Sequence, residues 1–352
     1  MKRIGFVSGN ISRSGGTERV ATLIANELIK NYEIYIISYG PEGKSYFYLN
    51  PDIKIINLSR GKSKIRNKLT AAYKLRKIIK KYNIDTLIDI DVILSINTLI
   101  ATYKLDTEVI SWEHFNFYSN VGVKRRDWAR RLAAKYSDQI ITLTEQDKNQ
   151  YLSNLNVVSK IDYIYNPTPY PHAQKSLCKN RTAIAVGRLN YQKGFDRLLQ
   201  IWGQIEKKDR EWKLLIIGSG EDRDKLLKQI EELKLERVEI IEHTEEIKKY
   251  YEDASIYLMT SRFEGLPMTL IEAQSFGIPV ISYDIKTGPR DIVLNNRNGY
   301  LIEDGNERDF IDKFLQLSGD SLKIQEFSRN AYEDSGRFGM ENIIKKWEEI
   351  LK

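Results

Sequence analysis

Short, strongly apolar runs recur along the chain and alternate with longer amphipathic stretches. The runs span residues 4–9, 34–40, 85–91, 109–113 and 139–144 in the first half, and 183–187, 213–218, 238–242, 255–260 and 280–284 in the second. Near-continuous apolar runs of this length are typical of parallel strands that are covered on both faces. The stretches between them, such as Glu18–Lys30 and Glu221–Leu233, have helical spacing. The alternation predicts a doubly wound α/β fold.

The strand–helix pattern occurs twice, which predicts two Rossmann-like domains. Three prolines lie between residues 166 and 180 and indicate a linker there. We therefore expect an N-terminal domain over 1–168 and a C-terminal domain over 169–335. Residues 336–352 contain apolar positions at helical spacing and predict a last helix that could pack back on the first domain.

Composition narrows the class of protein. A chain of 352 residues, 41% of them hydrophobic, suits two domains of ordinary size. The single Cys178 excludes an intrachain disulfide, and no apolar stretch reaches about 18 residues, so we expect a cytoplasmic protein without a membrane span. Residues 1–170 hold 26 Lys and Arg against 16 Asp and Glu, which favours an anionic partner for the first domain.

The segment from Ser261 to Val280 lies between two predicted strands and combines a glycine turn with a helix start. Backbone N–H groups and the helix dipole at such a point favour phosphate or sugar oxygens. Glu264 lies at the turn, and Glu272 follows about two helical turns later, so both carboxylates could accept hydroxyl hydrogen bonds along one helix edge. From spacing alone, a solvated Glu-rich helix face remains the alternative.

Three other segments contain candidate chemistry. In Gly187–Phe195, Arg188 and Lys193 are suited to phosphate oxygens, although two ordinary surface cations are the alternative. Gly15 and Gly16 follow the first strand and allow close backbone approach to an anion, or form a plain turn. His114 ends a predicted strand, where parallel sheets bind ligands, but a structural histidine is the commoner outcome.

Glu264, seven intervening residues, Glu272, and then Ala273 and Gly277–Val280 resemble the signature of retaining GT-B glycosyltransferases of family 4. The resemblance extends over nearly the whole chain. It implies two facing Rossmann-like domains, with a nucleotide-sugar donor held mainly by the C-terminal one. It also implies that Glu264 contacts the donor sugar and that Glu272 holds the ribose hydroxyls.

The resemblance assigns further donor-binding roles. Arg188 and Lys193 match the residues that bind the diphosphate, and with Glu264 and His114 they form the implied catalytic set. His114 would touch the donor sugar near the reacting carbon. His243 and Thr244 depart from the family pattern near the base. The remaining implied donor contacts are Gly15, Gly16, Gly218, Gly220, Gly265, Leu266, Pro267, Met268 and Thr269.

Residues Arg60 to Lys81 contain ten Lys and Arg and no Asp or Glu, with apolar residues at helical spacing. This basic amphipathic helix favours anionic lipid headgroups or a pyrophosphate-linked lipid acceptor. A solvated helix face is the alternative, and RNA is disfavoured because stacking aromatics are scarce. The expected acceptor or membrane contacts are Lys68, Lys74, Lys77, Lys81, Arg125 and Arg126.

We therefore predict a retaining glycosyltransferase that moves a hexose or N-acetylhexosamine from a UDP-sugar to a glycan, such as a lipid-linked or surface-polysaccharide precursor. The resemblance implies front-face departure of the diphosphate. We expect no cofactor, no metal and no nucleic-acid partner, because we interpret Asp89 and Asp91 as strand-end structure. Peripheral contact with the inner face of the plasma membrane is expected. The alternatives are a nucleotide-sugar epimerase on the same fold and a non-catalytic nucleotide-sugar-binding module.

Overall fold

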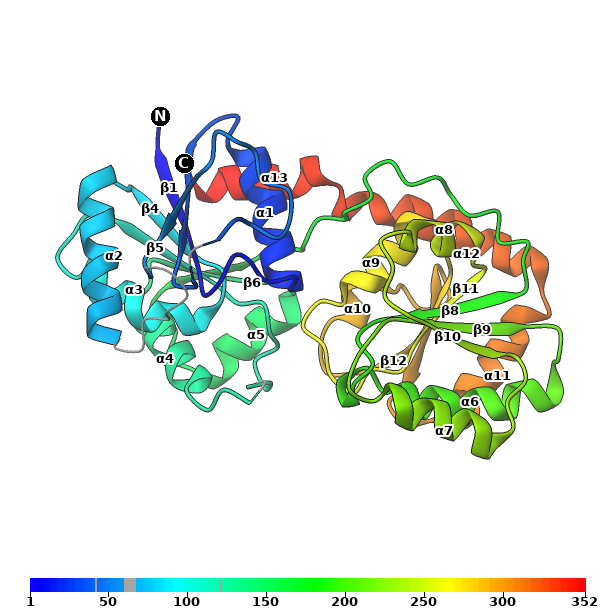
Figure 1. Ribbon diagram of the computed structural model, residues 1–352. Coiled ribbons are helices and arrows are strands. Elements are labelled where there is room, and N and C mark those ends of the chain that lie inside the picture. The colour runs from blue at the N-terminus through cyan, green and yellow to red at the C-terminus, as the bar shows by residue number, and fades with distance from the viewer. Residues whose placement is uncertain (42, 60–67, 121) are drawn as a thin grey trace. The chain divides into compact units, whose positions relative to one another are not determined.

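The computed structural model describes residues 1–41, 43–59, 68–120 and 122–352, and the chain divides into two compact units (Figure 1). Unit 1 comprises Met1–Pro167 together with Met340–Lys352, and unit 2 comprises Thr168–Gly339. Each unit is built on one parallel sheet with helices wound around it. The predicted fold class, two doubly wound Rossmann-like domains, is confirmed.

Unit 1 contains a seven-stranded parallel sheet in the order β3-β2-β1-β4-β5-β6-β7. Its strands are β1 (Arg3–Ser8), β2 (Glu33–Ser38), β3 (Lys54–Asn57), β4 (Thr86–Asp89), β5 (Glu108–Trp112), β6 (Gln139–Thr142) and β7 (Lys160–Tyr163). Its helices are α1 (Gly16–Leu28), α2 (Lys68–Tyr82), η1 (Val92–Leu94), α3 (Ser95–Thr102), α4 (Arg126–Tyr136), α5 (Glu145–Asn154) and α13 (Met340–Ile350). The strand order reverses between β1 and β4, which makes their carboxyl ends a topological switch point.

The helices of unit 1 form two layers. Helices α2, α3 and α4 contact one another in series, whereas α1 contacts α13 (Figure 1). Right-handed crossovers place these two groups on opposite faces of the sheet. The last helix is fixed by packing, because the Trp347 ring meets Trp112 edge to face with centroids 4.8 Å apart. The Lys2 ammonium also donates to the Leu351 carbonyl at 3.0 Å, so the two ends of the chain meet in unit 1.

Unit 2 contains a six-stranded parallel sheet in the order β10-β9-β8-β11-β12-β13. Its strands are β8 (Thr182–Val186), β9 (Lys213–Ile217), β10 (Val238–Ile241), β11 (Ile256–Met259), β12 (Val280–Asp284) and β13 (Gly299–Glu303). Its helices are η2 (Tyr191–Lys193), α6 (Phe195–Lys208), α7 (Arg223–Leu233), α8 (Ile247–Asp253), α9 (Met268–Ser275), α10 (Pro289–Ile292), α11 (Glu307–Ser318), α12 (Ser321–Asp334) and η3 (Ser335–Phe338). The switch point of this sheet lies between β8 and β11.

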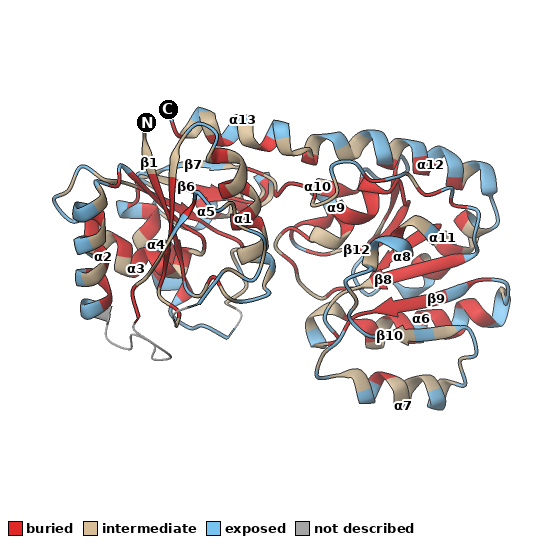
Figure 2. Ribbon diagram, turned by 45° about the horizontal axis from the view of Figure 1, so that its top comes forward, coloured by how far each residue is buried: buried red, intermediate tan, exposed pale blue. Residues whose placement is uncertain are grey.

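Three strands were not expected from the apolar pattern, namely β3, β7 and β13, and all three are edge strands. β3 and β7 contain no fully buried residue, while every residue of β4 and β11 is buried. Figure 2 shows the same for the inner strand β8, which is drawn largely in red, the colour of buried residues. An edge strand is covered less completely, so its sequence need not be continuously apolar. β13 begins at Gly299, directly after the Asn-rich segment 295–298, whose composition is typical of a turn and does not predict a following strand.

No helix among the described residues is long and apolar enough to cross a membrane.

Candidate active site

The densest group of predicted site residues in unit 2 lies at the carboxyl ends of β8 and β11. The loop after β8 contains Arg188 and Lys193 and leads into α6, and the loop after β11 contains Glu264 and leads into α9. Because these two strands flank the switch point, the loops that leave them diverge to opposite faces of the sheet and leave a crevice. Ligands of doubly wound sheets bind at this position.

Lys193 and Glu264 form an ion pair inside this crevice. The Lys193 ammonium lies 2.7 Å from Oε1 of Glu264, whose side chain is only 8% exposed. Ser261 Oγ donates to the same oxygen at 2.8 Å, and Gln192 Nε2 donates to Oε2 at 3.2 Å. Three donors from two loops therefore hold one carboxylate. An incoming diphosphate would compete with Glu264 for the Lys193 ammonium.

The Glu264 loop is braced from a third strand. Thr287 Oγ1, which follows β12, donates to the Glu264 carbonyl at 2.7 Å. Gly288 has a φ of +99°, and a Cβ there would lie 2.5 Å from the Gly265 carbonyl and 2.6 Å from Pro267 Cδ. The close approach requires glycine at this position. Thr287 and Gly288 thus support the loop that contains Glu264.

Glu264 does not share a helix edge with Glu272, contrary to the expectation from spacing. Helix α9 begins at Met268 with Pro267 at its N-cap, so Glu264 lies in the preceding loop. Gly265, Leu266, Pro267, Met268 and Thr269 form the turn and first residues of this helix. The first turn of an α-helix has N–H groups without intrahelical acceptors, so Met268 and Thr269 present donors to the crevice.

Glu272 is held in the interior of unit 2. Its side chain lies one turn into α9 and is 5% exposed, and Tyr251 Oη of α8 donates to Oε2 at 2.8 Å. Burial and the neighbouring Glu272 carboxylate raise the pKa of Tyr251 well above its usual value, so this hydroxyl stays a donor. The Tyr251 ring stacks on Phe276 with centroids 5.2 Å apart. Sequence reasoning missed Tyr251, because no local signal links α8 to α9.

Arg188 does not join the ion pair of Lys193 and Glu264, because it forms an ion pair with Glu221 instead. Its side chain is 70% exposed and lies 3.2 Å from the carboxylate of Glu221, in the segment that precedes α7. Lys193 and Glu264 are thus brought together, while Arg188 lies at the surface. A bidentate phosphate contact by Arg188 would require it to exchange Glu221 for the ligand.

Gly218 and Gly220 interlock with the loop after β8. A Cβ on Gly218 would lie 1.9 Å from the Gly187 carbonyl, and one on Gly220 would lie 2.2 Å from the Leu189 carbonyl. Backbone packing alone therefore requires both glycines. The exposed His243 and the half-buried Thr244 follow β10, and the His243 N–H donates to Ser219 Oγ at 3.1 Å. The structure thus places Gly218, Gly220, His243 and Thr244 in the adjacent loops that follow β9 and β10.

In unit 1 the predicted residues gather around the other switch point. Gly15 is the N-cap of α1 and Gly16 its first residue, and the Glu18 carboxylate lies where a Cβ on Gly15 would be. Burial raises the pKa of Glu18, with the Asp91 charge adding to the effect. Glycine at position 15 thus leaves room for an acidic side chain, and the anion-binding interpretation of this loop remains a prediction.

His114 follows β5 and is 8% exposed. Burial and the nearby Arg126 cation lower the pKa of His114 to about 3. The imidazole is therefore neutral near pH 7, and its Nε2 has no hydrogen-bond partner in the part of unit 1 that the structure describes. A neutral imidazole suits contact with a sugar hydroxyl better than protonation of a leaving group.

A buried charge cluster shapes the loop that contains His114. Glu113, fully buried, accepts from Arg130 Nε at 2.7 Å, from Tyr151 Oη at 2.9 Å and from the Phe115 N–H at 3.1 Å. Arg130 also donates to the carbonyls of Asn116, Phe117 and Ser119. We call Glu113, Arg130 and Tyr151 the clasp, because together they fold the chain back over residues 114–120.

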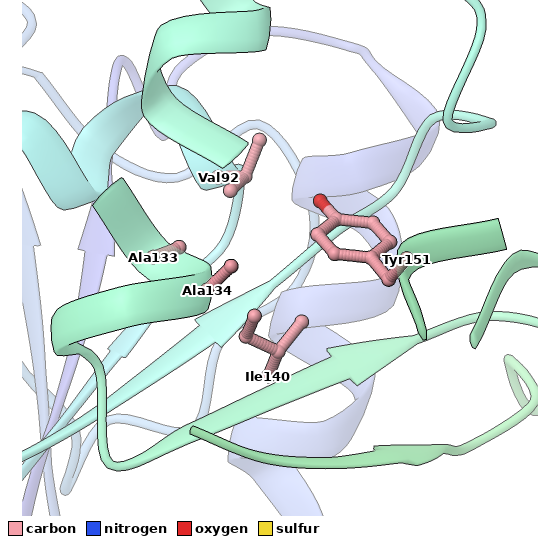
Figure 3. Close-up of a cluster of buried hydrophobic side chains, with 5 residues drawn as sticks. All are labelled: Val92, Ala133, Ala134, Ile140 and Tyr151. Atoms are coloured by element: carbon pink, nitrogen blue, oxygen red, sulfur yellow. The ribbon is translucent and has the colours of Figure 1, made fainter. Parts of the chain in front are cut away.

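Tyr151 anchors the clasp in the core. Its ring packs against a cluster of buried apolar side chains, and Figure 3 shows these residues around it: Val92, Ala133, Ala134 and Ile140. The Tyr151 hydroxyl is the one polar side-chain group of this cluster, and it donates a hydrogen bond to the Glu113 carboxylate. The clasp is therefore rigid, since its polar contacts are buried and its apolar side is packed.

Arg126 was expected to contact the acceptor or the membrane, and this prediction is wrong because its side chain is buried. Its side chain is 4% exposed, and its two terminal nitrogens lie 2.5 and 3.1 Å from the carboxylate oxygens of Asp91. An internal bidentate pair of this kind removes Arg126 from the basic surface. Asp91 is thereby explained as the partner of Arg126, and Asp89 is buried and accepts from Thr98 Oγ1 at 2.6 Å.

Of the other expected acceptor residues, Lys77, Lys81 and Arg125 are exposed. Lys74 is half-buried and donates to the Leu58 carbonyl at 2.9 Å. Lys68 begins α2, and residues 60–67 of the basic segment lie outside the described residues. No group of three or more His, Cys, Asp or Glu suited to a metal occurs in the ranges that the structure covers.

Two family models match almost the entire chain. The model described as "Glycosyltransferase Family 4" matches residues 14–169, and that described as "Glycosyl transferases group 1" matches residues 172–334. The first match ends at residue 169 and the second begins at 172, a few residues after the boundary between the two units at Pro167 and Thr168.

Full-length relatives and solved structures agree with these matches. The chain is 31% identical over 364 residues to the amylovoran biosynthesis glycosyltransferase AmsD of Erwinia amylovora, covering 100% of both chains. It is 26% identical to the Campylobacter jejuni alpha-1,4-N-acetyl-D-galactosaminyltransferase whose name gives a GalNAc-GalNAc-diNAcBac-PP-undecaprenol substrate, covering 100% of this chain and 98% of that one.

Among solved structures, a mutant of Staphylococcus aureus TarM in complex with fondaparinux, alpha-GlcNAc-glycerol and UDP superposes with a TM-score of 0.83 at 19% identity, covering 100% of both chains. At this identity the likeness shows the fold. With the family models and the full-length relative, it leads to one conclusion. The chain belongs to the family 4, group 1 glycosyltransferases of the GT-B fold.

Proposed function

We propose that this glycosyltransferase moves a hexose or N-acetylhexosamine from a UDP-sugar to a glycan acceptor with retention of anomeric configuration. The observation that carries the proposal is the convergence of Lys193, Glu264 and the start of α9 at the switch point of unit 2. A nucleoside diphosphate needs cationic and N–H donors, and a sugar needs a carboxylate acceptor. These loops offer both within one crevice.

In the proposed reaction the diphosphate draws Lys193 away from Glu264. The ammonium then stabilises the charge that develops on the leaving phosphate, together with the backbone N–H groups at the start of α9. Glu264, released from Lys193, accepts from hydroxyls of the donor sugar. Glu272 accepts from the ribose, oriented by Tyr251. Retention and the UDP base rest on the family signature, and the solved relative contains UDP.

The acceptor is proposed to be a lipid-linked or surface-polysaccharide precursor. The name of the Campylobacter relative specifies a PP-undecaprenol glycan, and the exposed lysines of α2 suit a diphosphate or an anionic headgroup. We propose peripheral contact of unit 1 with an anionic membrane on the same grounds.

The test is a titration of the full chain with UDP, followed by product analysis. We expect UDP to bind in EDTA, because Lys193 and the helix start provide the counter-charge. Loss of binding on metal removal would refute this point. NMR of the product formed from an α-linked donor should show an α-linkage, and an inverted linkage would refute retention. Epimerisation of the donor sugar without any acceptor and without release of UDP would instead identify the chain as an epimerase.

A further inference from the structure

Unit 1 contains an apolar groove that the glycosyltransferase reaction does not use. It lies between α3 and α4, has a volume of about 870 Å³, and is lined mainly by Ile96, Leu99, Ile100, Leu105, Trp128 and Leu132. Glu108 and Asp138, which lie at the amino ends of β5 and β6, close one end. The groove is therefore at the opposite end of the sheet from the loops that contain His114 and Gly15.

Large apolar side chains are exposed along this groove. Trp128 is 51% exposed, Tyr136 58%, Tyr103 68% and Ile100 46%. Two of these come from the end of α3 and its following turn, and two come from one side of α4. A cluster of exposed aromatic and aliphatic residues around a hollow marks an interaction surface rather than ordinary solvated surface.

Cations surround the groove on both sides. Lys77, Lys80 and Lys81 are exposed on α2, and Arg131 and Lys135 are exposed on α4. Helix α2 is tied to the rim, because Arg76 Nη1 donates to the carbonyls of Ala101 and Tyr103 at 2.7 and 2.8 Å. Lys104 adds another exposed cation at the turn after α3. The exposed acids of α4 and the rim, Asp106, Asp127 and Asp138, are fewer.

The combination of exposed aromatic residues and surrounding cations favours an anionic membrane over a second copy of the chain as the partner of this groove. An isologous contact with a second copy would place the two cationic rims against each other, which is unfavourable. An anionic bilayer offers headgroups to the lysines and an apolar boundary to the aromatic rings. Trp and Tyr are enriched at that boundary, because their rings are apolar at one end and polar at the other.

We propose that Ile100, Tyr103, Trp128 and Tyr136, here called the aromatic rim, insert into the headgroup region of an anionic membrane while the lysines of α2 contact its phosphates. The membrane contact proposed above for α2 is electrostatic, whereas the rim adds an apolar anchor that salt does not screen. The inference rests on the proposed function only in that a membrane-borne acceptor makes such an anchor useful.

Trp128 reports directly on this proposal. The chain contains five tryptophans, and the other four, at positions 112, 202, 212 and 347, are at most 3% exposed. Fluorescence changes of the full chain on adding vesicles therefore come mainly from Trp128. We expect a blue shift, and quenching by doxyl-labelled lipid, with vesicles of phosphatidylcholine and phosphatidylglycerol.

Variants separate the two components of binding. Trp128→Ala combined with Tyr136→Ala should weaken partitioning by about tenfold or more at both low and high salt. Lys77→Glu with Lys81→Glu should weaken it strongly at low salt and little at high salt. Leu322→Ala, at an 81% exposed site on α12, is the matched control and should bind like the wild type.

Three results would overturn the proposal. These are vesicle binding without any change in Trp128 emission, equal binding of the Trp128/Tyr136 variant and wild type, and a dimer in light scattering that the Trp128 variant abolishes. UDP titration of the same preparations distinguishes the two proposals. Lost vesicle binding with intact UDP binding would reject the membrane surface alone, and the reverse would reject the proposed function alone.

Discussion

Removal of the Glu272 carboxylate tests the donor assignment most directly. Glu272 is 5% exposed and is oriented by Tyr251 Oη at 2.8 Å, so it can hold a fixed geometry for the ribose hydroxyls. A lost hydrogen bond to a charged group costs roughly 1.5–3 kcal/mol. At 1.4 kcal/mol per tenfold, Glu272→Ala should weaken UDP binding by about ten- to 150-fold.

Removing a ribose hydroxyl from UDP and removing the Glu272 carboxylate from the protein together form a double-mutant cycle. Wild type should bind UDP more tightly than 2′-deoxy-UDP or 3′-deoxy-UDP, whereas Glu272→Ala should bind the three nucleotides with nearly equal affinity. Titration calorimetry measures all six affinities. Tyr251→Phe is the control, because it keeps the carboxylate and the ring and removes only the orienting hydroxyl, so its preference for UDP should be reduced and not lost.

Stability must be followed in parallel, because Glu272→Ala leaves the buried Tyr251 hydroxyl without this acceptor. An unsatisfied buried donor costs about 1–3 kcal/mol, which lowers the midpoint of thermal unfolding without unfolding the chain at room temperature. If Glu272→Ala weakens UDP and both deoxynucleotides by the same factor, the carboxylate does not hold the ribose and the assignment is wrong.

Three further predictions address the remaining groups. Glu264→Gln should lower kcat by roughly ten- to a hundredfold with little change in UDP affinity, while Lys193→Met should weaken UDP binding. Initial rates and UDP titrations measure the two effects. A loss of UDP affinity in Glu264→Gln with unchanged affinity in Lys193→Met would contradict their roles. Arg130→Met should destabilise unit 1 by about 3–5 kcal/mol, because the buried Glu113 loses its counter-charge, and adding Glu113→Gln should restore part of the loss in urea unfolding; no recovery would argue against the clasp. Burial raises the pKa of Asp89 to about 8, so the folded chain keeps a proton that the unfolded chain releases above about pH 4. The stability of wild type relative to Asp89→Asn should therefore fall as pH rises from about 5 to about 8, by up to about 1.4 kcal/mol per pH unit, and a flat difference would be inconsistent with a buried neutral carboxyl.

The sequence by itself determined the architecture and the family. Continuous apolar runs such as those at β4 and β11 are fully buried strands, because only parallel strands covered on both faces need such runs. The apolar pattern did not predict the edge strands β3 and β7, because a partly exposed strand does not need a continuous apolar run. The motif around Glu264 and Glu272 identified the family because its residue types and spacing are local properties of one strand–turn–helix unit.

Only the tertiary structure decided how each side chain is used. Tyr251 orients Glu272 from another helix, Lys193 and Glu264 neutralise each other across two loops, and Arg126 turns inward to Asp91 instead of joining the basic surface. Each of these pairs joins residues from different elements, between 21 and 71 positions apart. Periodicity along one element predicts which face a residue occupies, but the partner across the fold is set by how the sheet brings distant loops to one edge.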